Sequence, residues 1–419
     1  MSVPSRDEVT AEVRAWLEEN WDADRPLGPW RSLLADSGWG CPSWPKQWYG
    51  RGLPVAMDDV VTAEFARVGA VGVPVGGGMG LAAPTILACA DDDVKARFLR
   101  RIVTGEDTWC QLFSEPTNGS DLAGLMTRAD RDGDEWIVNG QKVWNTSAHH
   151  ADYGMLLART DWGVPKHKGI TYFVLPMHQP GVEVRPLHQM NRHSSFNEVF
   201  MTDARIPVSH VVGAPGEGWR VALSTLAHER RFGAMSRPKL NGSGRCVDEA
   251  RAEAEDYFQV YSWYPQRAGR ADLMIEHARQ RGVADDPLVR QAITRALSVY
   301  RTGQWTAQRA AAARRLGREP GAEGSLGKLG LSNVARAAHI AHTVIAGASG
   351  LLNGPDATMD GVVAEILVST PAQSIAGGTD EIQRNIIGEQ VLGLPKEPQV
   401  DRDQPFRDVV RGAGGRAQA

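Results

Sequence analysis

One feature of the sequence restricts the possible folds more than any other. It is a block of short strand-like runs that lies between two long stretches of helical pattern. In residues 1–108, apolar residues recur at the three- and four-residue spacing of amphipathic helices. In residues 109–215 the apolar runs become short and rich in Val, Ile, Trp and Tyr, with Asp-Gly, Asn-Gly and Pro-Gly turns between them. Long helical patterns return in residues 216–395, and alternating βαβ units are absent from the pattern. The sequence therefore predicts an α+β fold, with a β domain between two helical domains.

Composition excludes several classes of protein. The net charge is −4 and the basic residues are scattered, so we expect neither nucleic acid nor a membrane surface as a partner. The four cysteines are far apart without a Cys-x-x-Cys pair, and the histidines form no zinc-type motif, so we expect neither disulfides nor a metal site. The N-terminus has no apolar signal region, and the most hydrophobic stretch, residues 66–90, is interrupted by Gly, Pro and Arg67. These features predict a soluble cytoplasmic protein whose polar tail, residues 396–419, is partly disordered.

Two motifs in the middle segment carry most of the functional information. The first reads Ser-Glu-Pro-Thr-Asn-Gly-Ser-Asp over residues 114–121, and the second reads Asn-Gly-Gln-Lys-Val-Trp-Asn-Thr over residues 139–146. Further segments follow in order, GWRVALSTLAHERR at 218–231, AGASG at 346–350 and GGTDEIQR at 377–384. Together these motifs resemble the acyl-CoA dehydrogenase family over residues 8 to about 395. The resemblance implies that family's fold: an N-terminal helical domain, a β-barrel-like middle domain that binds flavin and a C-terminal four-helix bundle.

The resemblance implies FAD as the cofactor, bound without a Rossmann fold. The cluster VGGGMG at 75–80 does not match the Gly-x-Gly-x-x-Gly pattern of dinucleotide loops. A flavin ring needs an apolar wall and hydrogen-bond partners at its polar edge, and Trp144 and Thr146 share one face of a predicted strand. The alternative for Trp144 is an ordinary core tryptophan beside a surface turn. By resemblance, the Thr146 hydroxyl meets flavin N5, Gln111, Phe113 and Ser114 address the flavin edge, Gly119 permits close approach, and Ser120 lies on the CoA phosphate side.

The family holds part of each FAD with segments of a neighbouring subunit. By resemblance these segments supply Gly347, Ala348, Thr379 and Glu381 here. One departure concerns the arginine of an Arg-x-x-Phe-Gly stretch, which in the family meets the FAD pyrophosphate. The equivalent region, residues 278–291, lacks the Phe-Gly pair, so Arg279 and Arg281 are both candidates and Arg279 is the one that we assign.

The position of the catalytic base is the second departure. Many family members carry a glutamate directly before the Gly-Thr pair, where this chain has Gly377. Others carry it on the first long helix of the bundle, and the matching residue here is Glu229, in Leu-Ala-His-Glu-Arg-Arg. At about 100° per residue, Glu229 shares an apolar stripe with Ala222 and Thr225. The resemblance implies that Glu229 is the base, that the Gly377 N–H polarises the thioester carbonyl, and that Arg230 binds substrate; the alternative for Glu229 is an ion pair with Arg230 or another basic residue.

The leading hypothesis is an FAD-dependent acyl-CoA dehydrogenase that acts on a bulky or branched acyl-CoA and passes electrons to an electron-transfer flavoprotein. Relatives that oxidise sterol side chains look most similar in these motifs. A homotetramer is implied, with a heterotetramer as the alternative assembly. Two other functions stay open at this point: a non-catalytic, FAD-poor partner subunit of a heteromeric dehydrogenase, and a flavin oxidase or monooxygenase on the same fold.

Overall fold

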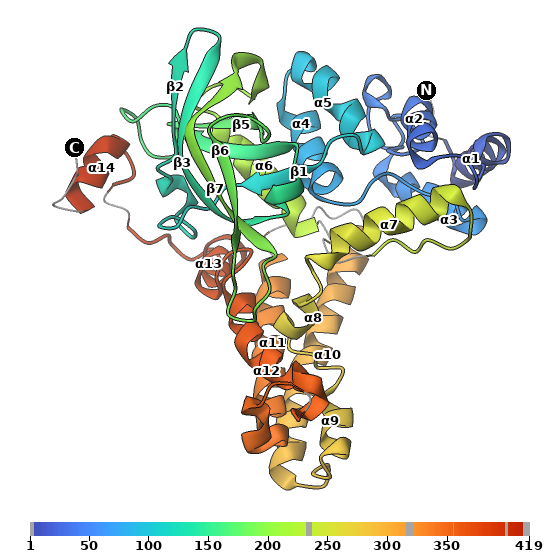
Figure 1. The fold of residues 1–419 in the computed structure, drawn as a ribbon, viewed down its shortest axis with the longest axis vertical. Helices are drawn as coiled ribbons and strands as arrows, with labels where there is room; N and C mark the ends of the chain where they lie inside the picture. Colours follow the sequence, from blue (N-terminus) through green and yellow to red (C-terminus); the bar gives the residue numbers. More distant parts are fainter. Residues whose placement is uncertain are drawn as a thin grey trace. The chain divides into compact units, whose positions relative to one another are not determined.

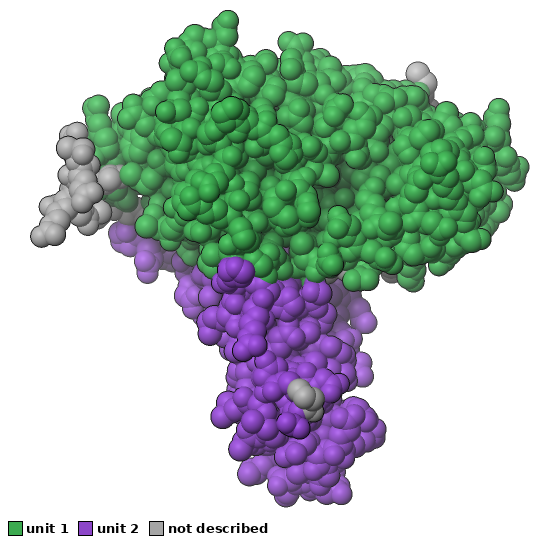
Figure 2. All heavy atoms as spheres, in the orientation of Figure 1, with its two compact units in different colours: residues 1–187, 194–261, 400–419 green, residues 188–193, 262–399 purple. Residues whose placement is uncertain are grey.

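The computed structural model describes residues 4–231, 237–315, 322, 324–354, 356–398 and 401–413, without the side chains of 230, 231, 314, 315 and 410–413 (Figure 1). The chain forms two compact units (Figure 2). Unit 1 comprises residues 1–187, 194–261 and 400–419, and unit 2 comprises residues 188–193 and 262–399. Each unit has its own hydrophobic core.

Unit 1 begins with a group of helices. The first starts at a capping box, in which the Ser5 hydroxyl accepts from the Glu8 N–H and the Glu8 carboxylate accepts from the Ser5 N–H. Val9, Val13 and Leu17 follow at helical spacing and are buried in a core shared with α7 (Arg245–Gln259). The helices of this group are α1 (Arg6–Asn20), which begins at the capping box, α2 (Leu27–Ser37), α3 (Asp58–Val68), α4 (Ala83–Cys89) and α5 (Asp92–Thr104), with short turns η1 (Lys46–Trp48), η2 (Val55–Met57) and η3 (Gly78–Ala82).

The β domain forms one sheet in the order β6-β7-β3-β2-β4-β5-β8, and β1 pairs in parallel with β4. The sheet curls, because Phe173 and Leu175 of β5 share an interior cluster with Val199 and Met201 of β7. The opposite face of β4 and β5 packs against α4, α5 and α6 (Gly218–Arg231), so both faces of these strands are buried and their apolar runs are unbroken. The strands are β1 (Trp109–Leu112), β2 (Arg128–Asp132), β3 (Glu135–Thr146), β4 (Tyr153–Arg159), β5 (Ile170–Pro176), β6 (Val182–Leu187), β7 (Phe196–Pro207) and β8 (Val211–Val212), with turns η4 (Leu122–Gly124), η5 (Ala148–His150) and η6 (Val208–His210).

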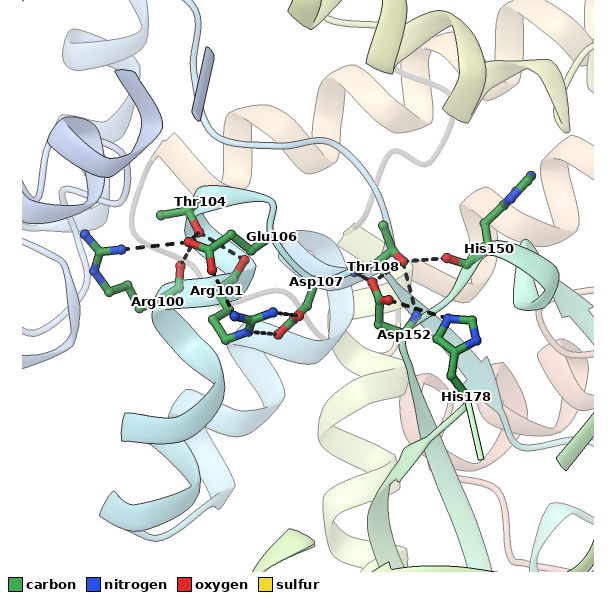
Figure 3. Close-up of polar contacts among 9 residues, drawn as sticks. All are labelled: Arg100, Arg101, Thr104, Glu106, Asp107, Thr108, His150, Asp152 and His178. Carbon is green, nitrogen blue, oxygen red and sulfur yellow. Dashed lines mark hydrogen bonds and ion pairs between the residues drawn. The ribbon is translucent and has the colours of Figure 1, made fainter. Parts of the chain in front are cut away.

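A polar network joins the end of α5 to the start of β1 (Figure 3). Arg101 of α5 forms a two-point ion pair with Asp107, at 2.7 and 2.5 Å. The N–H and the hydroxyl of Thr108 both donate to the Asp152 carboxylate at 2.8 Å, and this carboxylate lies 3.6 Å from His178. Since Thr108 directly precedes β1 and Asp152 directly precedes β4, these contacts fix where the two strands begin to pair.

Part of the C-terminal tail is attached to the β domain. Phe406 is only 3% exposed, packs on Trp162 with ring centroids 5.7 Å apart, and donates its N–H to the Val164 carbonyl at 2.9 Å. The buried aromatic side chain and the backbone hydrogen bonds hold residues 406–409, and partial disorder of residues 396–419 stays a prediction. Unit 1 is completed by α6 (Gly218–Arg231), α7 and α14 (Phe406–Ala413).

Unit 2 is helical, with two long helices packed along each other. Met274 and Ala278 share its core with Ala338 and Ala341 of the second long helix. Also buried there are His277 and His342, whose Nδ1 atoms lie 3.0 Å apart. The elements of unit 2 are α8 (Tyr264–Arg267), α9 (Met274–Gln280), α10 (Pro287–Arg315), α11 (Gly324–Ala346), η7 (Gly347–Leu351), η8 (Thr358–Gly361), α12 (Val362–Ser369), η9 (Thr370–Ser374), α13 (Asp380–Ile386) and η10 (Ile387–Val391).

The succession of helices, sheet and helices confirms the predicted α+β fold. The helices of residues 216–395 are divided, because α6 and α7 pack in unit 1 whereas α8 to α13 form unit 2. Among the described residues, no helix combines the length and the apolar character needed to cross a bilayer. Within the same residues, no group of three or more His, Cys, Asp or Glu side chains could hold a metal ion.

Candidate active site

The indole of Trp144 stands at the surface near the end of β3. Between Lys142 and Asn145 the register of β3 shifts against β7, so that two residues of β3 face one residue of β7. Trp144 lies in this bulge with φ of 65°, in the left-handed region that few side chains adopt. Its side chain is 57% exposed and meets the Phe196 ring edge-on, with centroids 5.7 Å apart. The exposure contradicts the core alternative and leaves a flat apolar surface for a ligand.

A buried ion pair between Lys142 and Glu115 lies next to this bulge and supports it. Lys142 Nζ lies 2.9 Å from Glu115 Oε1, with side chains 0% and 5% exposed, and it also donates to the Phe113 carbonyl at 2.9 Å. The Glu115 carboxylate accepts the backbone N–H groups of Met126 and Thr127 at 2.6 and 2.8 Å. Burial opposes the charge of Glu115, but Lys142 and these hydrogen bonds outweigh it and hold the pKa of Glu115 below its usual value. Glu115 and Lys142 therefore join the two sequence motifs into one rigid support.

Residues 111–114 lie beside the bulge. Asn145 Nδ2 donates to the Gln111 carbonyl at 2.7 Å, and the Val143 N–H donates to the Ser114 carbonyl at 2.9 Å. Over the part of the chain that the structure describes, the hydroxyls of Ser114 and Thr146 have no hydrogen-bond partner. The structure thus brings the predicted residues of both motifs together, with two hydroxyls free to bind a ligand.

Glu229 lies near the end of α6, on the stripe that faces the core. Ala222 and Thr225 of that stripe are 0% exposed, and Glu229 is half-buried. Gln111 of β1 donates its side-chain Nε2 to Glu229 Oε2 at 3.3 Å. Helix α6 therefore places the Glu229 carboxylate beside β1, the strand that precedes the first motif. The side chain of Arg230 is outside the described residues, so its predicted contact with substrate stays a prediction.

The loop after Ser114 is open to the surface. Gly119 and Ser120 are exposed, and nothing lies within 4 Å of the place that a Cβ on Gly119 would occupy. The loop is closed at its base, where Glu115 and Asn118 pair through their backbones. This geometry leaves Ser120 accessible from the surface, and its place on the CoA side stays a prediction.

Two glycines begin the Gly-Thr segment of unit 2. Gly377 and Gly378 have φ of 68° and 86°, and Gln383 Nε2 donates to both of their carbonyls at 3.2 and 3.3 Å. The Thr379 hydroxyl accepts the Ile382 N–H at 3.3 Å and caps α13. No atom lies within 4 Å of a Cβ built on Gly377, so its peptide group is not crowded by the described part of its own chain.

The arginine candidates differ in what they contact. Arg279 is exposed on α9, whereas Arg281 Nη2 donates to the Ala346 carbonyl at 3.4 Å, directly before the AGASG segment. Arg281 is therefore the candidate that reaches the predicted cofactor segment within unit 2. The remaining predicted residues of this unit, Gly347, Ala348 and Glu381, are exposed.

Comparison with known families decides the relationship of the chain. Models of the acyl-CoA dehydrogenase N-terminal, middle and C-terminal domains match residues 5–106, 110–204 and 267–392. The chain belongs to the acyl-CoA dehydrogenase family. It is 36% identical to acyl-CoA dehydrogenase IpdE1 of Mycobacterium tuberculosis over 414 residues, which cover 93% of this chain and 98% of that protein. It is also 36% identical to acyl-CoA dehydrogenase FadE34 of the same organism, over 93% of this chain and 48% of that longer protein.

Solved structures of the family agree with this membership. The Tcur3481-Tcur3483 steroid acyl-CoA dehydrogenase superposes with a TM-score of 0.63 at 25% identity, covering 95% of this chain and 100% of the matched chain. The ChsE4-ChsE5 complex from Mycobacterium tuberculosis superposes with a TM-score of 0.59 at 27% identity, covering 94% and 99%. The chain is accordingly an oxidoreductase by family.

Members of the family are FAD-dependent flavoproteins, and the residues present here fit such a cofactor. The exposed indole of Trp144 offers a flat apolar wall, and the hydroxyls of Ser114 and Thr146 offer hydrogen bonds beside it. The side chain of Gln111, as the partner of Glu229, is the contact that sequence reasoning missed. In the sequence, Gln111 is the polar residue of the run Trp-Cys-Gln-Leu, which marks the residue but does not indicate its partner.

Proposed function

We propose that this chain is an FAD-dependent acyl-CoA dehydrogenase in which Glu229 removes the α-proton of a bulky acyl-CoA thioester. The observation that carries the proposal is the contact of Glu229 with Gln111, which places a half-buried carboxylate next to the strand motifs of Trp144 and Thr146. A half-buried carboxylate suits this task, because further loss of water on substrate binding raises its proton affinity.

The reaction converts the Cα–Cβ single bond of the substrate into a double bond. The proton on Cα goes to a Glu229 oxygen, and the electron pair of the broken Cα–H bond forms the new bond. When bound, FAD supplies the acceptor for the hydride that leaves Cβ. Gln111 holds the Glu229 carboxylate by a neutral donor, and the Gly377 N–H donates to the thioester oxygen as negative charge develops there. Trp144 would offer its exposed indole as an apolar wall to the flavin ring.

The substrate class is proposed from the space at Gly377 and from the relatives. A residue without a side chain leaves volume beside the thioester, and no described atom of the chain fills that volume. One solved relative is described as a steroid acyl-CoA dehydrogenase. We infer that the substrate is branched or cyclic close to the reacting carbons, as in a steroid-derived acyl-CoA, and that an electron-transfer flavoprotein takes up the electrons.

The assembly is proposed as a tetramer of one or two kinds of chain. Helices α10 and α11 of unit 2 expose large apolar side chains, among them Trp305 at 64%, Leu331 at 56% and Ile340 at 54%. Exposed apolar surface of this kind is typical of subunit interfaces. Two solved relatives contain two different proteins each. Light scattering of the purified chain alone distinguishes a homotetramer from a chain that needs a second one.

Anaerobic titration with a panel of acyl-CoA thioesters tests the function. We expect the purified protein to be yellow and its flavin absorbance to be bleached by at least one bulky acyl-CoA. Glu229→Gln is expected to bind the same thioester without bleaching, whereas Glu217→Gln, an exposed glutamate directly before the same helix, is expected to bleach as the wild type does. Bleaching that survives in Glu229→Gln contradicts the base, and a protein that cannot take up FAD alone favours the partner-subunit function. Rapid oxygen consumption during turnover favours an oxidase.

A further inference from the structure

Arg159, the last residue of β4, is a fully buried cation held by carbonyl groups. Its side chain is 0% exposed and donates to the carbonyls of Ala123 at 2.6 Å, Leu125 at 3.2 Å and Lys166 at 3.0 Å. Burial lowers the pKa of Arg159 to about 10. Ala123 and Leu125 belong to the second half of the loop that carries Gly119 and Ser120. Arg159 therefore ties this loop to the segment that follows β4.

The C-terminal segment covers Arg159. The ring of Phe406 lies over the guanidinium, with Cζ 3.6 Å from the ring centroid, and Phe406 itself is 3% exposed. Its neighbour Arg407 donates its N–H to the Trp162 carbonyl at 3.0 Å, beside the bond from Phe406 to Val164. We call residues 401–409 the C-terminal strap. Its aromatic anchor covers the buried guanidinium that binds the loop.

A second contact reaches the loop from the strap. Lys166 Nζ lies 3.1 Å from both carboxylate oxygens of Asp121 and 3.9 Å from Asp401 of the strap. Asp121 directly follows Ser120. The strap thus meets the loop twice, through Phe406 and Arg159 on one side and through Asp401 and Lys166 on the other.

We propose that the C-terminal strap is a positioning element for CoA binding, because it holds the loop that presents Ser120. The inference rests on the proposed function and on the prediction from the family resemblance that Ser120 lies on the CoA phosphate side. We expect the strap to act on the affinity for CoA, because its contacts through Arg159 and Lys166 lead to the loop that presents Ser120.

Steady-state kinetics of strap variants tests this role. Removing the ring in Phe406→Ala is expected to raise KM for acyl-CoA roughly three- to tenfold, the range of one cation–π contact, with kcat within about twofold of wild type. Phe406→Tyr keeps the ring face and is expected to restore KM. Asp408→Ala changes an exposed side chain of the same helix and serves as the matched control. If Phe406→Ala does not fold, Phe406→Leu keeps the apolar volume without the ring and carries the same expectation.

The outcomes separate the strap from the proposed function. Suppose that the flavin of the wild type is bleached by acyl-CoA, but the Phe406 variants leave KM unchanged or lower only kcat. This result refutes the role of the strap in CoA binding and leaves the proposed function intact. Calorimetry with free CoA gives a second readout, and we expect weaker binding by Phe406→Ala in proportion to KM. A wild type that neither bleaches with any acyl-CoA nor binds free CoA overturns both proposals.

Discussion

Replacing Gln111 by leucine removes the amide donor to Glu229 at nearly constant side-chain volume. A donor stabilises the charged form of a carboxylate, so its loss raises the pKa of the base. A hydrogen bond contributes about 0.5 to 1.5 kcal/mol net, and 3.3 Å lies at the long end of the range for N–H···O bonds, so we take about 0.5 to 1 kcal/mol here. At about 1.4 kcal/mol per unit, this energy corresponds to a rise of about 0.4 to 0.7 pKa units.

The assay is the pH dependence of kcat/KM, whose acid limb reports the base in the free enzyme. For Gln111→Leu we expect this limb to move to higher pH by about half a unit, with rates close to wild type at alkaline pH. Gln141→Leu is the matched control, because Gln141 Nε2 makes the same kind of bond to Glu198 Oε1, at 2.9 Å, elsewhere in the β domain. An acid limb that stays in place, or that moves equally in Gln141→Leu, refutes the role of Gln111.

Three further perturbations have defined outcomes. Lys142→Met leaves the buried Glu115 without its cation and is expected to cost about 3 to 5 kcal/mol in chemical denaturation, whereas adding Glu115→Gln recovers part of that loss. Burial depresses the pKa of His277 from 6.5 to about 4, as it also lowers that of His342, so the unfolded chain binds these protons first. Stability from this pair is complete above about pH 6.5 and declines as pH falls toward about 4, and His277→Phe is expected to flatten that decline in melting temperature. Gly377→Ala keeps the N–H but places a side chain at φ of 68°, so we expect a loss of about 1 kcal/mol in stability and lower activity with a bulky acyl-CoA, because the methyl group enters the space proposed for the substrate.

Local patterns were enough to predict the succession of elements, and the family resemblance supplied the candidate site residues. The strand-like runs between residues 109 and 215 are short, β-branched and separated by turns, and each of these signals acts within a few residues. The stripe on α6 that carries Glu229 follows from helical geometry alone. The motifs at 114–121 and 139–146 are each contiguous, so their residues could be named before their contacts were known.

Contacts between distant segments could not be predicted in this way. The bulge at Trp144 depends on the register of β3 against β7, which no single strand encodes. The bond from Gln111 to Glu229 joins residues 118 positions apart, on a strand and a helix. The hydrophilic composition of the tail gave no sign that the aromatic anchor Phe406 attaches it to the β domain.

Strands β4 and β5 are buried on both faces, and this determines which positions of the enzyme can accept substitutions during evolution. Every residue of β4 after Tyr153 is buried, so a substitution there meets packed neighbours on whichever side it points. Strand β6 has the opposite character, because each of its residues is partly or fully exposed. A saturation library would therefore accept many amino acids along β6 and few along β4. Directed evolution toward new substrates would do best to leave β4 and β5 intact and to vary the loops and helix ends around them.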